Sequence, residues 1–120
     1  MRTTTLALAA GLWTLPASGH EAAGRHGGRV ADAGVFHVEL VTRPEGVDVY
    51  LSDAREAPVP VAGFRGTAIL VVAGKPARIP LVPAEGNRLS GRAALAPGER
   101  PRGAVQITAP DGATASGSFR

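Results

Sequence analysis

From about position 35 onward, apolar and polar residues alternate with a period of two, the pattern of half-buried β-strands. The first run, Val35–Thr42, places Phe36, Val38 and Leu40 on one face. The run 47–52 repeats the alternation at a matching length, after a Pro-Glu-Gly turn. These two runs predict a β-hairpin.

Five more short runs follow, at 66–72, 77–82, 88–95, 103–109 and 113–119, separated by turn signals rich in Gly and Pro. The run 66–72 is almost continuously apolar and predicts a strand buried on both faces. In the run 88–95, the alternation predicts that Leu95 points inward. The segment 57–61 contains two prolines, which predicts an edge segment or a crossing loop. The pattern predicts an all-β domain over residues 34–120, an antiparallel immunoglobulin-like β-sandwich of about seven short strands.

Composition supports one small β domain. With 44% hydrophobic but only 4% aromatic residues, the core has to be built from Val, Leu, Ile and Ala. The 16 glycines and 10 prolines disfavour long helices. The chain has no cysteine, and its single methionine is Met1, which excludes disulfides, thiolate metal sites and thioether ligands from the mature protein.

The N-terminus has the layout of a cleaved signal peptide over residues 1–19. Arg2 is followed by an apolar run of about ten residues, then Pro16 and the small residues Ala-Ser-Gly that end at Gly19. The run is too short for a stable transmembrane anchor, so we expect an exported, periplasmic protein that does not span the membrane after processing. The alternatives are cleavage after Gly24 and an apolar N-terminal helix that stays with the domain.

Residues 20–33 are Gly-rich and without a clear period, which predicts a flexible leader that carries histidines. Cleavage after Gly19 leaves His20 as the N-terminal residue, and its α-amine and imidazole together chelate a divalent metal. The candidate ligands that complete or extend this site are Glu21, His26, Asp32, His37 and Glu39. Nitrogen and oxygen donors favour Cu(II), Zn(II), Ni(II) or Co(II).

Two plainer interpretations stand beside the metal site: a solvated leader with incidental histidines, and a His37 that pairs across to a neighbouring strand. The net charge of +3 is small and the basic residues are scattered along the chain, so we expect no nucleic-acid partner. No serine lies in a nucleophile-elbow motif, and no carboxylate pair has the apolar setting of an acid–base couple. We therefore expect a protein that is not an enzyme.

The blocks 26–30, which begins His-Gly-Gly, 34–41, 46–53, 58–59 and 79–83 occur in an order that resembles small periplasmic "HGG" proteins. The same blocks resemble the N-terminal domain of the periplasmic adaptor subunits of heavy-metal RND efflux pumps. The resemblance implies a periplasmic β-sandwich linked to heavy-metal resistance, and thus a metal-handling or efflux accessory protein. The alternative function is an interaction module that docks to an efflux-pump or envelope protein without binding metal.

Overall fold

The computed structural model describes residues 22–120 as an all-β structure. The predicted signal peptide and the candidate ligands His20 and Glu21 lie outside the described residues. The nine strands are β1 (Ala22–Ala23), β2 (Arg29–Ala33), β3 (Phe36–Arg43), β4 (Gly46–Ser52), β5 (Arg65–Val72), β6 (Lys75–Pro83), β7 (Arg88–Arg92), β8 (Gly103–Thr108) and β9 (Thr114–Phe119).

The strands form one antiparallel sheet in the order β1-β2-β3-β4-β7-β6-β5-β8-β9. Its two halves are joined through only two residue pairs between β7 and β6, Val82–Ser90 and Pro83–Leu89. The all-β class and the antiparallel pairing are confirmed. Of the nine strands, β3 to β9 lie within residues 34–120, for which about seven were predicted, and β1 and β2 lie in the predicted leader. The immunoglobulin-like sandwich stays a prediction.

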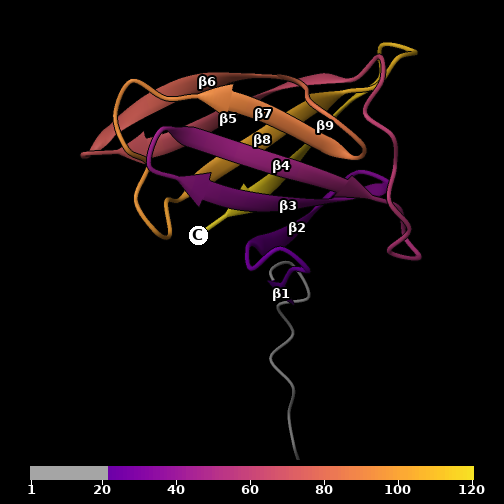
Figure 1. Ribbon diagram of the computed structural model, residues 1–120, viewed down its shortest axis with the longest axis horizontal. Coiled ribbons are helices and arrows are strands. Elements are labelled where there is room, and N and C mark those ends of the chain that lie inside the picture. The colour runs from indigo at the N-terminus through magenta and orange to yellow at the C-terminus, as the bar shows by residue number, and fades with distance from the viewer. Residues whose placement is uncertain (1–21) are drawn as a thin grey trace, which may run out of the picture.

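The sheet curls so that its halves face each other across one core. We call β2, β3, β4 and β7 the first layer, and β5, β6, β8 and β9 the second layer; β8 and β9 cross behind β3 and β4 in Figure 1. The core joins residues of both layers, among them Val38, Val49 and Leu89 from the first and Leu70 and Val105 from the second. The alternation therefore places one face of each layer in the core.

The predicted hairpin 35–52 is confirmed as β3 and β4, with their apolar faces buried as expected. The segment 57–61 is a loop, tied to β4 by a hydrogen bond from Val59 N to Leu51 O. The second layer differs more from the prediction. In β5, Leu70 is fully buried but Ile69 is only partly so, because β5 faces the core with one side alone. The run 88–95 ends as a strand at Arg92, and Leu95 is 61% exposed.

The predicted flexible leader is wrong for residues 29–33. These residues form β2, which pairs with β3 along its full length and buries Ala31 and Ala33. Arg29 anchors the start of β2, because its guanidinium donates to the carbonyl oxygens of Pro101 and Arg120 at 2.6 Å each. The inward residues of β2 are small, so its two-residue period is weak in the sequence.

Candidate functional site

The hairpin that connects β1 to β2 folds around the buried carboxylate of Glu39 on β3. Glu39 Oε2 accepts hydrogen bonds from the backbone N–H groups of His26 (2.8 Å) and Gly28 (2.9 Å). Glu39 Oε1 lies 2.8 Å from Nδ1 of the His26 imidazole. The Glu39 side chain is 8% exposed, so these contacts take the place of water around a nearly buried carboxylate.

Two glycines let the chain come this close. A Cβ at Gly24 would lie 2.1 Å from the carboxyl carbon of Glu39, and a Cβ at Gly28 would lie 2.3 Å from the backbone oxygen of Leu40. Gly27 between them has a φ of +77°, which favours glycine. The sequence analysis singled out the His-Gly-Gly motif by its letters, and the structure shows that it forms the tight turn that wraps Glu39.

Tyr50 on β4 fixes the plane of the His26 ring. The two rings are stacked, with centroids 3.6 Å apart and planes within 5° of each other. Tyr50 is the cross-strand neighbour of Glu39, so one sheet face supplies both the carboxylate and the aromatic platform. A carboxylate oxygen accepts hydrogen bonds, so Nδ1 of His26 is the donor in this contact, and in a neutral imidazole with that tautomer the lone pair is on Nε2.

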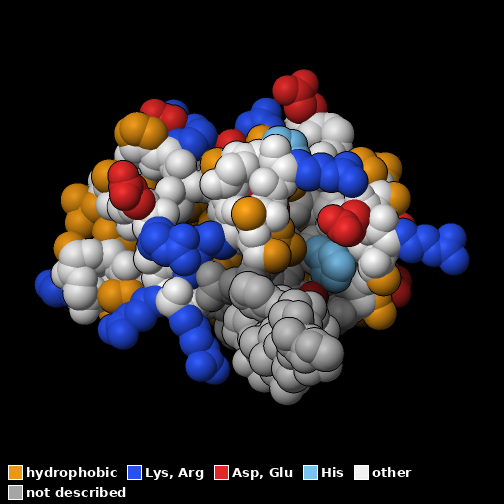
Figure 2. Space-filling view, turned by 90° about the horizontal axis from the view of Figure 1, so that it is seen from below, with side chains coloured by type: hydrophobic (Ala, Val, Ile, Leu, Met, Phe, Trp, Pro, Cys, Tyr) orange, Lys and Arg blue, Asp and Glu red, His pale blue; other side chains and the backbone are white. Residues whose placement is uncertain are grey.

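A second carboxylate–histidine pair lies beside the first. Asp32 and His37 are cross-strand partners on β2 and β3, and Asp32 Oδ1 lies 3.2 Å from His37 Nε2. His26, His37 and Glu39 line the same pocket of about 220 Å³. Figure 2 views the molecule from the side of β1 and shows histidine side chains at the surface beside acidic ones.

The loop after β4 closes the other side of this pocket. Glu56 lines the pocket and has a φ of 64°, which is rare for a residue with a Cβ. Asp53 holds the loop by accepting from the backbone N–H groups of Ala57 (2.9 Å) and Arg55 (2.8 Å). The hydrogen bond from Ala57 and, to a smaller extent, the one from Arg55 lower the pKa of the Asp53 carboxyl below its ordinary value.

The structure thus places three of the six candidate metal ligands, His26, His37 and Glu39, in the lining of one pocket, and a fourth, Asp32, contacts His37. Among residues 22–120, however, no three His, Cys, Asp or Glu side chains lie close enough to hold a metal ion as a group. Sequence reasoning missed Tyr50. Its signal was present, because Tyr50 alternates with the inward residues of the second hairpin strand, as Glu39 does in the first.

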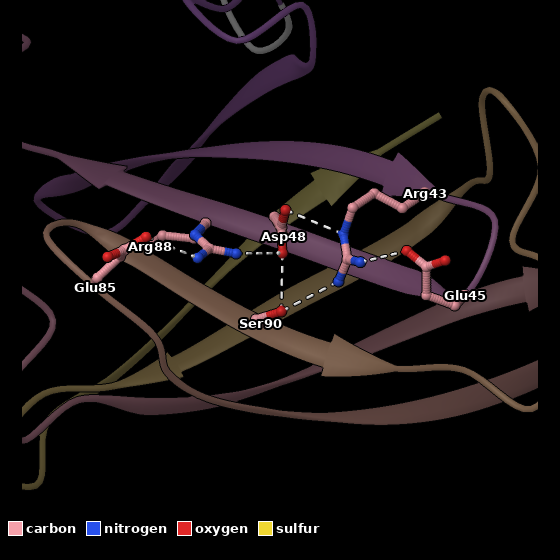
Figure 3. A network of polar contacts seen from close by, with 6 residues as sticks. All are labelled: Arg43, Glu45, Asp48, Glu85, Arg88 and Ser90. Atoms are coloured by element: carbon pink, nitrogen blue, oxygen red, sulfur yellow. Dashed lines mark hydrogen bonds and ion pairs between the residues drawn. The ribbon is translucent and has the colours of Figure 1, made fainter.

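A further polar cluster lies on the same face of the first layer, centred on the buried carboxylate of Asp48 (Figure 3). Asp48 Oδ1 accepts from the hydroxyl of Ser90 at 2.8 Å and lies 3.4 Å from Arg88 Nη1. Asp48 Oδ2 lies 3.1 Å from Arg43 Nε, an ion pair without hydrogen-bond alignment. Glu45 contacts Arg43 and Glu85 contacts Arg88, so each arginine of this cluster has two acidic partners. We interpret it as structural.

No protein family model, curated protein or solved structure matches this chain. Residues 22–120 include no helix with the length and apolar character needed to cross a membrane.

Proposed function

We propose that the protein is a periplasmic metal-handling accessory protein that binds a divalent metal ion at the His26 pocket, without catalysis. The observation that carries this proposal is the contact between His26 Nδ1 and Glu39 at 2.8 Å. Metal-ligating histidines commonly donate their second ring nitrogen to a carboxylate, which fixes the tautomer and orients the ring. Stacking on Tyr50 adds a second constraint, so His26 is oriented before any ion arrives.

The proposed roles follow from the contacts. Glu39 already accepts three hydrogen bonds, so we assign it to orient His26 rather than to bind the ion. His26 supplies Nε2, and His37 is the second imidazole on the pocket wall. The remaining donors are then assigned to His20 and Glu21, because the described residues supply no third ligand. This donor set of nitrogen and oxygen suits Cu(II), Zn(II), Ni(II) or Co(II).

Isothermal titration of the processed protein with Zn(II) and with Cu(II) tests the proposal. We expect His26→Ala to abolish or strongly weaken binding, because it removes the oriented ligand. Glu39→Gln keeps the side chain's size and an acceptor oxygen but removes the charge, and should weaken binding by about 10- to 100-fold. Arg92→Gln, an exposed change at the end of β7, is the matched control and should bind like wild type.

Far-UV circular dichroism of each variant checks that the β fold is retained. If wild type binds neither ion at micromolar concentration, or if folded His26→Ala binds as tightly as wild type, the metal proposal is wrong.

The second candidate is an immunoglobulin-like interaction module that docks to an efflux-pump or envelope protein without metal. The observation that favours it is the exposure of three large apolar side chains, Val35, Val82 and Leu95. Isolated exposed apolar residues are common in folded proteins, so this observation is weaker than the geometry at His26. A failed metal titration would leave this second candidate as the better proposal.

A further inference from the structure

An apolar groove opens into the core where the two layers part. Strands β6 and β7 pair at Val82–Ser90 and Pro83–Leu89 and still touch at Gly91, where a Cβ would lie 2.4 Å from the oxygen of Pro80. Beyond this point β7 ends at Arg92, and no further residue pair joins β6 to the chain that follows β7. The gap forms a groove of about 470 Å³ between the start of β6 and residues 93–95.

The lining of this groove is mostly apolar, and the charged side chains at its rim are cations. Val72, Ala77 and Ile79 line it from the β5–β6 hairpin, and Leu95 faces them from the loop after β7. Among residues 22–120, the charged residues in the lining are Lys75 and Arg78, both exposed cations. Neither forms an ion pair within residues 22–120, whereas Arg43 and Arg88 of the first layer do.

The strands of the second layer offer these cations no carboxylate. The four strands of the second layer contain no Asp or Glu, although they carry Arg65, Lys75 and Arg78. An apolar groove rimmed by uncompensated positive charge is complementary to a ligand with an apolar tail and an anionic head. Its volume lies in the range of pockets that hold small molecules, about 300–1,000 Å³.

The β5–β6 turn lies at the rim of this groove. Its two residues, Ala73 and Gly74, have φ values of 52° and 78°, as a two-residue hairpin turn between the paired Val72 and Lys75 requires. Within residues 22–120 only Ala73 and Glu56 combine a side chain with positive φ, and each lines one of the two pockets described here.

We propose that this groove binds a single-chain anionic amphiphile, with its tail between β6 and residues 93–95 and its head at Lys75 and Arg78. The site goes beyond the metal pocket and shares no lining residue with it. Binding buries the exposed Leu95 and neutralises two cations that have no partner in residues 22–120. A neutral amphiphile of equal length would bury Leu95 in the same way but would not neutralise the two cations.

Titration calorimetry with decanoate, kept below its micelle-forming concentration, tests the proposal, with decanol as the neutral comparison. We expect decanoate to bind with micromolar to submillimolar affinity and decanol at least ten-fold more weakly. The double variant Lys75→Gln/Arg78→Gln should lose about five-fold per charge, the upper end for an exposed ion pair. Leu95→Asp should weaken binding further, because it places a negative charge at the tail site.

Arg65→Gln is the matched control, since Arg65 is a cation of β5 outside the groove. It should bind decanoate like wild type, and every variant should keep the metal titration of wild type. The proposal is overturned if decanoate does not bind at millimolar concentration or if decanol binds equally well. It is also overturned if Arg65→Gln loses as much affinity as the double variant, because attraction would then be a property of net charge alone.

Discussion

The two layers of the curled sheet share one core but differ sharply on their outer faces. The first layer carries acidic side chains that contact basic ones: Glu39 with His26, Asp32 with His37, and Asp48 with Arg43 and Arg88. The strands of the second layer carry no acid, and their outward positions hold residues such as Thr67, Ile69 and Gln106. The alternating apolar residues of both layers are enough to form the core, so the outward-facing residues of the two layers can differ in chemistry.

This difference shows which layer depends on specific polar contacts for its structure. In the first layer, buried carboxylates fix the positions of loops and rings, since each must be satisfied by hydrogen bonds. In the second layer, little on the outer face depends on a partner within the domain. We therefore expect single polar substitutions to affect the first layer far more than the second.

The largest expected effect is at Asp48. Asp48→Ala removes the buried carboxylate that both arginines and the Ser90 hydroxyl contact, and leaves Arg43 and Arg88 with only the exposed Glu45 and Glu85, which should lower the free energy of unfolding by about 2–3 kcal/mol. This range is reduced from the fully buried case because Arg43 and Arg88 are about a third exposed. The matched change in the second layer, Thr67→Ala, should stay within about 0.5 kcal/mol. Urea unfolding measures both, and equal losses would contradict the comparison.

A smaller effect, an increase in stability, is expected at the two residues of positive φ that line the two pockets. Ala73→Gly and Glu56→Gly relieve positive φ, so each should stabilise the protein by about 0.5–1 kcal/mol after the added flexibility of glycine is subtracted. Ala57→Gly is the control, because Ala57 has no positive φ, and it should not stabilise. Thermal unfolding followed by circular dichroism reports the shift. A loss of stability in Ala73→Gly would show that the turn is not strained.

The smallest expected effect is a pH dependence at Asp53. Its pKa in the folded protein is lowered by the backbone donors Ala57 and Arg55, so its contribution is present above the unfolded-state pKa near 4 and is lost as pH falls through the lower folded value. Asp53→Asn should remove this contribution. The unfolding free energy of the variant should then fall less steeply than that of wild type as the pH drops below about 4. Glu99→Gln, in an exposed loop, controls for net charge.

Much of the fold could be predicted, and the exceptions have physical reasons. The hairpin of β3 and β4 was predictable because large apolar residues alternate with polar ones in both strands. β2 was not, because its inward residues are alanines and its anchor is Arg29, which is held by carbonyl oxygens 72 and 91 residues away in sequence. Leu95 was placed inward because the period continues through it, but the pairing of β7 ends at Arg92.

The candidate site shows the same division. The sequence alone determined that the chain builds an antiparallel β domain from aliphatic side chains, and that any ligand set among its side chains uses histidine and carboxylate without cysteine. Only the tertiary structure decided that Glu39 orients His26 while Asp32 contacts His37, because strand register sets which residues are cross-strand neighbours. The apolar groove likewise depends on where β6 and β7 part. That point is set by the packing of two strands against the core, which no local pattern in the chain records.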